Sequence, residues 1–84
     1  MKNGRNVLAK KIFSEQLKAV REEKKMTQHG LATVSNVNRS QIGEFERGVA
    51  NPTLDSLVEL ASALDVNLDD LMPMSRYNNE RATG

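Results

Sequence analysis

The polar side chains best suited to recognition chemistry lie close together near the middle of the chain. Arg39 carries a guanidinium with fixed N–H donors, Ser40 a hydroxyl that donates and accepts, and Glu44 a carboxylate that only accepts. Ile42 and Phe45 are apolar and three residues apart, so a helix here turns them inward and leaves the polar residues outside. Short polar groups on an exposed helix suit the base edges of the DNA major groove.

A tight turn and a preceding helix are predicted to hold this segment in place. Leu31 and Ala32 supply the inner face of the preceding helix. Asn36 suits the turn because, after Gly, Asn tolerates left-handed backbone best. Val37 fills the turn from inside, and Thr27 and Asn38 can cap the helices before and after it by accepting a backbone N–H bond. Gly48 is predicted to end the later helix as its C′ residue. The pattern therefore predicts a helix-turn-helix.

Three further helices complete an all-α, five-helix fold. The first is predicted to start at its cap, Asn6, and to end in the charged run 21–25. Its apolar residues Phe13, Leu17 and Val20 follow a helical period. Leu8 and Ile12 lie off this apolar stripe, so they either extend the core or cover the tail or a partner.

The fourth and fifth helices are predicted from their caps, Thr53 and Asn67, and Pro73 ends the fifth. Leu60 widens the apolar surface of the fourth helix beyond what a small core needs. The residues predicted to face inward are Leu54, Leu57, Val58, Ala61, Leu64, Leu68, Leu71 and Met72. We expect a flexible segment at 1–5, the domain at 6–73 and a flexible tail at 74–84.

Composition narrows the function classes. The chain has 84 residues, enough for one small domain, and no Cys, which excludes disulfides and thiolate metal sites. No apolar run approaches the roughly 18 residues of a membrane span, so we expect a soluble cytoplasmic protein. The only His, His29, has no nucleophile or base arranged around it, so no catalytic residue, metal or cofactor is predicted.

Charge is distributed unevenly although the net charge is only +1. Residues 1–27 carry eight Lys or Arg and three Glu, whereas residues 54–84 carry six acidic residues and two Arg. This split either forms a basic face for phosphate and an acidic end away from it, or is an ordinary solvated surface.

Several short motifs, in order and at matching spacing, resemble the lambdoid phage repressor/Cro (Xre-type) helix-turn-helix family. They cover roughly residues 12–72. The matching pieces are Leu17-Lys18 with Arg21, Met26-Thr27-Gln28, Leu31-Ala32, Ile42, Phe45-Glu46-Arg47-Gly48, Asn51-Pro52-Thr53-Leu54, and Leu57 through Leu71. Within the family the chain looks like a restriction–modification controller protein or a small phage or plasmid repressor.

The resemblance implies roles for matching positions. Gln28 would contact a phosphate at the start of the second helix, and Asn51 and Thr53 would do so from the loop before the fourth helix. Arg21 and Glu46 would form a partly buried salt bridge between the first and third helices. Relatives usually dimerise, often through the last two helices, on half-sites about one DNA turn apart.

The outward residues of the third helix are Arg39, Ser40, Gly43 and Glu44, which we predict to read bases. Arg39 can reach guanine O6 and N7 together, although phosphate contact is the alternative. Glu44 could accept a hydrogen bond from cytosine N4, or act mainly by excluding other DNA sequences. The alternative is that it pairs with a neighbouring Arg. Gly43 either allows close backbone approach or marks a position where no side chain is needed. Gln41 and Arg47 are predicted phosphate contacts.

These observations predict a sequence-specific transcriptional regulator that binds an inverted repeat in double-stranded DNA as a homodimer. The dimer interface is predicted at Leu60, Leu68 and Met72. Two alternatives keep the fold and change its use. An antitoxin would bind a toxin, for example through the tail from Ser75 onward, and a protein-binding adaptor would use the wide apolar face of the fourth helix.

Overall fold

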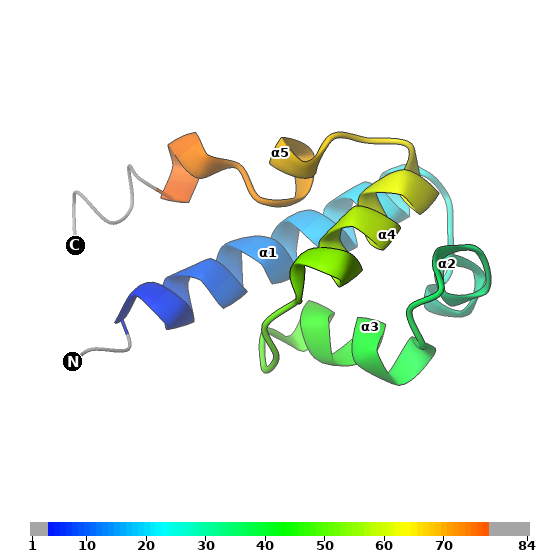
Figure 1. Ribbon diagram of the computed structural model, residues 1–84, viewed down its shortest axis with the longest axis horizontal. Helices are drawn as coiled ribbons and strands as arrows, with labels where there is room; N and C mark the ends of the chain where they lie inside the picture. The colour runs from blue at the N-terminus through cyan, green and yellow to red at the C-terminus, as the bar shows by residue number, and fades with distance from the viewer. Residues whose placement is uncertain (1–3, 78–84) are drawn as a thin grey trace.

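The computed structural model describes residues 4–77, and within them the chain is all-α, as predicted (Figure 1). The helices are α1 (Gly4–Glu23), α2 (Gln28–Ser35), α3 (Arg39–Arg47), α4 (Leu54–Leu64) and α5 (Leu68–Leu71). Helix α1 runs along the length of the molecule, with α3 and α5 on opposite sides of it and α2 near its C-terminal end (Figure 1). This arrangement leaves one side of α3 uncovered by another helix.

The core joins α1 to the helix-turn-helix and to α4. Phe13 of α1 and Phe45 of α3 meet edge to face, with ring centroids 5.5 Å apart and planes at 67°. Such a pair adds about 0.5–1.5 kcal/mol to the free energy gained from burying the rings. The buried apolar side chains that form the core cluster are Phe13, Leu17, Val20, Leu31, Val37, Ile42, Phe45, Leu60, Ala61, Leu64 and Leu71.

Side-chain caps begin the three central helices where the sequence predicts them. Thr27 Oγ1 accepts a hydrogen bond from the Gly30 N–H at 2.9 Å, and Asn38 Oδ1 accepts one from the Gln41 N–H at 2.8 Å. Thr53 Oγ1 does the same for α4 at 3.0 Å. Each cap satisfies an N–H group that the helix itself leaves unpaired.

Left-handed residues end the same helices. Asn36 has φ 61° at the end of α2 and Gly48 has φ 75° at the end of α3, both as predicted. The Asn36 amide also donates to Glu59 of α4 at 3.4 Å, which ties the turn to that helix. Asp65, with φ 59°, ends α4 and was not predicted, because an Asp gives a weaker signal than Gly or Asn.

Helical structure extends past both predicted domain ends. Helix α1 begins at Gly4, so Asn6 lies within the helix and is not its cap. Residues 74–77 form a further helical turn, in which the Tyr77 N–H donates to the Pro73 carbonyl at 3.1 Å. Arg76 in this turn pairs with Glu15 of α1. The remaining parts of the two predicted flexible segments, 1–3 and 78–84, lie outside the described residues.

The predicted inward faces of α4 and α5 were partly wrong. Leu60 is fully buried, whereas Leu54 is 70% and Val58 50% exposed. Residues 57, 60, 61 and 64 recur at steps of three and four and define the inner face, so residue 58 falls on the flank of the helix. Leu68 is 42% exposed, although Leu71 is buried as predicted.

The off-stripe residues of α1 also have a defined place. Ile12 is fully buried, so it extends the apolar interior, and Leu8 is half-buried. None of the helices within residues 4–77 has the length and apolar character needed to cross a bilayer.

Candidate nucleic-acid interface

Helix α3 presents polar side chains outward and apolar ones inward, as its pattern predicts. Arg39, Ser40 and Glu44 are exposed, while Ile42 and Phe45 are buried. Because α3 packs against the core through these two apolar residues, the side chains on its outer surface are not needed for that packing. The outward orientation of Arg39, Ser40 and Glu44 is therefore confirmed, and the contacts of the predicted base-reading residues with DNA stay a prediction.

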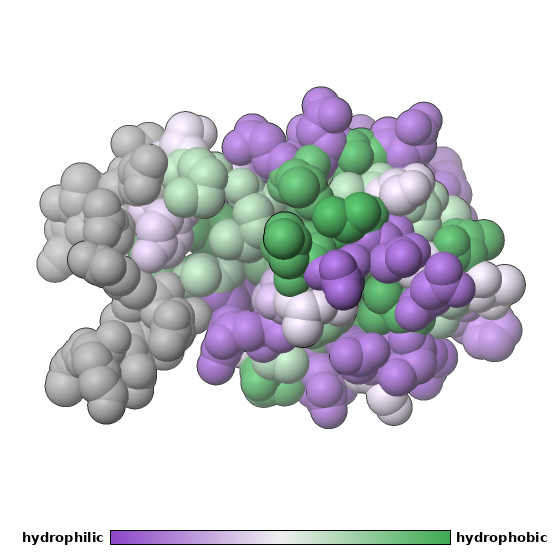
Figure 2. Space-filling model, viewed as in Figure 1, coloured by the Kyte–Doolittle hydropathy of each residue, from purple (hydrophilic) through white to green (hydrophobic). Residues whose placement is uncertain are grey.

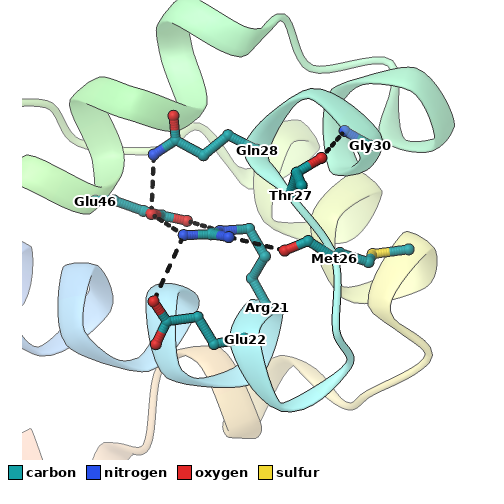
Figure 3. A network of polar contacts seen from close by, with 7 residues as sticks. All are labelled: Arg21, Glu22, Met26, Thr27, Gln28, Gly30 and Glu46. Atoms are coloured by element: carbon teal, nitrogen blue, oxygen red, sulfur yellow. Dashed lines mark hydrogen bonds and ion pairs between the residues drawn. The ribbon is translucent and has the colours of Figure 1, made fainter.

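A salt bridge between Arg21 of α1 and Glu46 of α3 holds these two helices together. Arg21 donates from Nε to Glu46 Oε2 at 2.7 Å and from Nη2 to Glu46 Oε1 at 2.9 Å (Figure 3). The side chains are only 11% and 4% exposed. The pair implied by the family resemblance is thus present, and it has the bidentate geometry that binds a carboxylate most strongly.

The same guanidinium also holds the loop between α1 and α2. Arg21 Nη1 donates to the Met26 carbonyl at 2.8 Å, directly before the cap of α2 (Figure 3). The hydrogen bonds with Glu46 raise the pKa of Arg21, against the opposing effect of desolvation. Because a raised pKa favours the charged form in the folded state, this contribution to stability is complete below the ordinary pKa of arginine and is lost only above it.

Gln28 joins this network, which the sequence did not reveal. Its Nε2 donates to Glu46 Oε1 at 3.0 Å, and its carbonyl oxygen points away from Glu46 (Figure 3). This orientation is chemically required, since a carboxylate can only accept. Gln28 was predicted to contact phosphate, but one of its two N–H donors is already engaged in the folded protein.

Gly43 lies between Gln28 and Arg47 on the surface of α3. A methyl group added to Gly43 would lie 3.4 Å from Arg47 Nη1 and 3.9 Å from Gln28 Oε1. The guanidinium of Arg47 is therefore folded back along its own helix by one turn, above a position that has no side chain.

The other predicted phosphate contacts lie on the surface of the same part of the molecule. Gln41 is exposed in the first turn of α3. Asn51 and Thr53 are exposed in the loop that leads from α3 to α4, at the lower edge of the molecule in Figure 1. Thr53 keeps its hydroxyl engaged with Ser56, accepting from its backbone N–H and donating to its Oγ at 3.0 Å.

The residues predicted to form the dimer interface differ in how exposed they are. Leu60 is in the core and cannot contact a second chain, so this prediction was wrong; Met72 is half-buried. Leu54, Val58 and Leu68 are exposed instead, and we name them the α4–α5 patch. Figure 2 shows hydrophobic side chains gathered over these two helices.

Removal of the Glu46 carboxylate should destabilise the fold. We expect Glu46→Ala to lower the free energy of unfolding by about 3–5 kcal/mol, because Arg21 would be left buried without its counter-ion. Glu46→Gln keeps the shape and should lose less. Urea denaturation checks this, with Arg39→Ala as the exposed control, expected within about 0.5 kcal/mol of wild type. A free energy of unfolding for Glu46→Ala equal to that of wild type would contradict the structural role of the Arg21–Glu46 pair.

Gly43→Ala should have the opposite effect on stability. We expect it to raise the free energy of unfolding by about 1 kcal/mol, since Ala is the better helix former and the added methyl meets the ends of two flexible side chains, Arg47 and Gln28, at ordinary contact distances. Gly30→Ala is the matched comparison in α2. Its methyl would lie 3.2 Å from the capping Thr27 Oγ1, so the gain there should be smaller. Equal gains in urea denaturation would show that local packing does not distinguish the two glycines.

Comparison with known proteins identifies the family that this chain resembles in sequence. Residues 17–71 match the family described as HTH_3: Helix-turn-helix. The control protein C.SmaI of Serratia marcescens is 33% identical over 72 residues, covering 86% of each chain. The uncharacterized HTH-type transcriptional regulator y4dL of Sinorhizobium fredii is 42% identical over 68 residues, which are 76% of this chain and only 35% of that protein.

Solved structures agree with the sequence relatives. The restriction-modification controller protein C.AhdI from Aeromonas hydrophila superposes with a TM-score of 0.70 at 37% identity, over 77% of this chain and 96% of that one. An HTH_3 family transcriptional regulator from Vibrio cholerae gives a TM-score of 0.76 at 27% identity. That match covers 79% of this chain but 37% of the other.

These matches confirm the resemblance predicted from the sequence motifs. The family match includes the whole helix-turn-helix and both members of the Arg21–Glu46 pair. It spans well over half of the chain. The protein belongs to the HTH_3 family of helix-turn-helix proteins.

Proposed function

We propose that this protein is a sequence-specific transcriptional regulator that inserts α3 into the major groove of double-stranded DNA. The observation that carries this proposal is the row of exposed polar residues on α3, held in position from behind by the Arg21–Glu46 salt bridge. A rigid helix with free donors and acceptors is what direct readout of base edges requires. Membership of the helix-turn-helix family supports the same function, and a protein that regulates transcription in this way would act in the cytoplasm.

Base reading is assigned to the outer residues of α3. Arg39 is the first residue of the helix, so its guanidinium would reach a guanine as a bidentate donor. Ser40 would donate or accept beside it. Glu44, one turn further, would accept from cytosine N4 or repel other arrangements near the phosphates. Gly43, which has no side chain, would leave room beside them for the side chain of Arg47.

Phosphate contacts would fix the register of α3 in the groove. Arg47 and Gln41 would contact the backbone from α3, and Asn51 and Thr53 from the loop that follows it. The N-terminus of α2, where Gln28 lies, would add the positive end of a helix dipole.

Charge placement supports this orientation. Acidic residues are concentrated on α4 and α5, and α5 lies across α1 from α3 (Figure 1). The acidic residues of α5 and of the turn before it would therefore stay away from the DNA phosphates, whereas Asp55 lies beside the proposed phosphate contact Thr53. The acidic residues of these helices and the turn between them are Asp55, Glu59, Asp65, Asp69 and Asp70.

A homodimer would bind an inverted repeat through two copies of α3. The α4–α5 patch is the surface we assign to the second copy, since it is apolar and exposed. A two-fold interface there would place the two α3 helices on half-sites about 34–36 Å apart. The restriction–modification controller type is favoured because C.SmaI and C.AhdI match over 86% and 96% of their own lengths.

Selection from random duplex DNA at about 150 mM salt tests the proposal. We expect wild type to recover an inverted repeat, and Arg39→Ala to lose preference at one base pair in each half-site, because about 1–3 kcal/mol of discrimination disappears with a bidentate contact. Recovery of no motif by either protein would contradict DNA reading. It would direct attention to a protein partner, as in an antitoxin or adaptor of this fold.

Sedimentation of Val58→Gln with Leu54→Gln tests the dimer surface. We expect wild type to sediment as a dimer and the double variant as a monomer with unchanged helical circular dichroism, because both side chains are exposed in the single chain. Val34→Gln on α2 is the matched control, since Val34 is 56% exposed and lies outside the patch. A dimer that survives the double substitution would place the interface elsewhere.

A further inference from the structure

Two side chains from different helices converge above Gly43. The carbonyl oxygen of Gln28, from the first position of α2, and the guanidinium of Arg47, from the last position of α3, both lie within 4 Å of the point that a Gly43 side chain would occupy. A Cβ at position 43 would be in van der Waals contact with both groups.

Glu46 determines which atom Gln28 presents to this space. Because the carboxylate takes the amide N–H at 3.0 Å, the carbonyl oxygen must face the other way (Figure 3). The atom that Gln28 offers toward Arg47 is therefore an acceptor. A guanidinium has five N–H donors and no acceptor, so the two groups are complementary.

Arg47 keeps its charge available. Within residues 4–77 it forms no salt bridge, although Glu44 precedes it by three residues on the same helix. Gln28 and Arg47 are neighbours whose side chains share no hydrogen bond within residues 4–77. A guanidinium that donates to one fixed oxygen still has donors left for a phosphate.

We propose that Gln28 is a positioning residue for Arg47. Glu46 aims the carbonyl oxygen of Gln28, that oxygen accepts a hydrogen bond from the Arg47 guanidinium, and Arg47 binds the DNA phosphate with its remaining N–H groups. Gly43 provides the space in which this happens. The inference rests on the proposed function, and it replaces the direct phosphate contact predicted for Gln28 with an indirect one.

A double-mutant cycle on the selected duplex separates the two modes. Gln28→Met removes the amide at similar length, and Arg47→Met removes the charge. We expect each single variant to weaken binding roughly tenfold and to lower the salt slope by about one, with the double variant no weaker than Arg47→Met. The slope is informative because a neutral amide that touched phosphate by itself would release no counterion.

Gln41 supplies the matched control, since it is a neutral predicted phosphate contact on α3 away from Gly43. Gln41→Met should leave the salt slope unchanged and should be additive with Arg47→Met. Relaxation of the Arg47 Nε–H group in the complex provides a second measurement, and its order parameter should fall in Gln28→Met. Thermal melts of every variant check that the fold is intact.

The outcomes distinguish the inference from the function on which it rests. Additive losses from Gln28→Met and Arg47→Met, with no change of slope in Gln28→Met, would overturn the positioning role and leave DNA binding in place. An Arg47 order parameter that is unaffected by Gln28→Met would do the same. Failure of wild type to bind any duplex would overturn the proposed function itself.

Discussion

The buried pair between Arg21 and Glu46 is the interaction on which the arrangement of the helix-turn-helix depends. Two charges removed from water cost several kcal/mol each, and the cost is offset only when their remaining donors and acceptors are satisfied. Here the guanidinium donates twice to Glu46 and once to the Met26 carbonyl, and Glu46 accepts a further bond from Gln28. Satisfying one ion pair thus fixes α1, the loop after it, α2 and α3 relative to each other.

The same carboxylate connects the core to the outer surface of α3. Glu46 is three residues after Gly43 and Arg47 is four residues after it, so all three lie on neighbouring parts of one helix face. Glu46 is the buried member of this group and stabilises the fold, whereas Arg47 is exposed to solvent. Arg39, Ser40 and Glu44 make no such structural contact. Substitution of these three side chains would therefore leave the scaffold of this protein intact, whereas loss of the Glu46 carboxylate would not.

Sequence reasoning succeeded where the deciding interaction is local. The caps Thr27, Asn38 and Thr53 each bond to a backbone N–H three residues later, and the left-handed turn at Asn36 depends on one residue. It failed where tertiary packing decides. The apolar residues of α4 fit more than one inward stripe, and only contact with α2 and α5 selects the stripe that contains Leu60. The Gln28–Glu46 bond depends in the same way on how α2 crosses α3.

One local inconsistency nevertheless pointed to the site. A Gly inside a helix costs about 1 kcal/mol relative to Ala, and sequences that specify a fold usually avoid such conflicts except where function requires them. Gly43 is in the middle of α3, and it is also the position over which Gln28 and Arg47 converge. Gly30 shows the structural counterpart, because its added methyl would crowd the Thr27 cap. Gly43, which lies beside an arginine that forms no salt bridge within residues 4–77, is the glycine whose cost the fold does not explain, and the proposed contact of α3 with DNA would account for it.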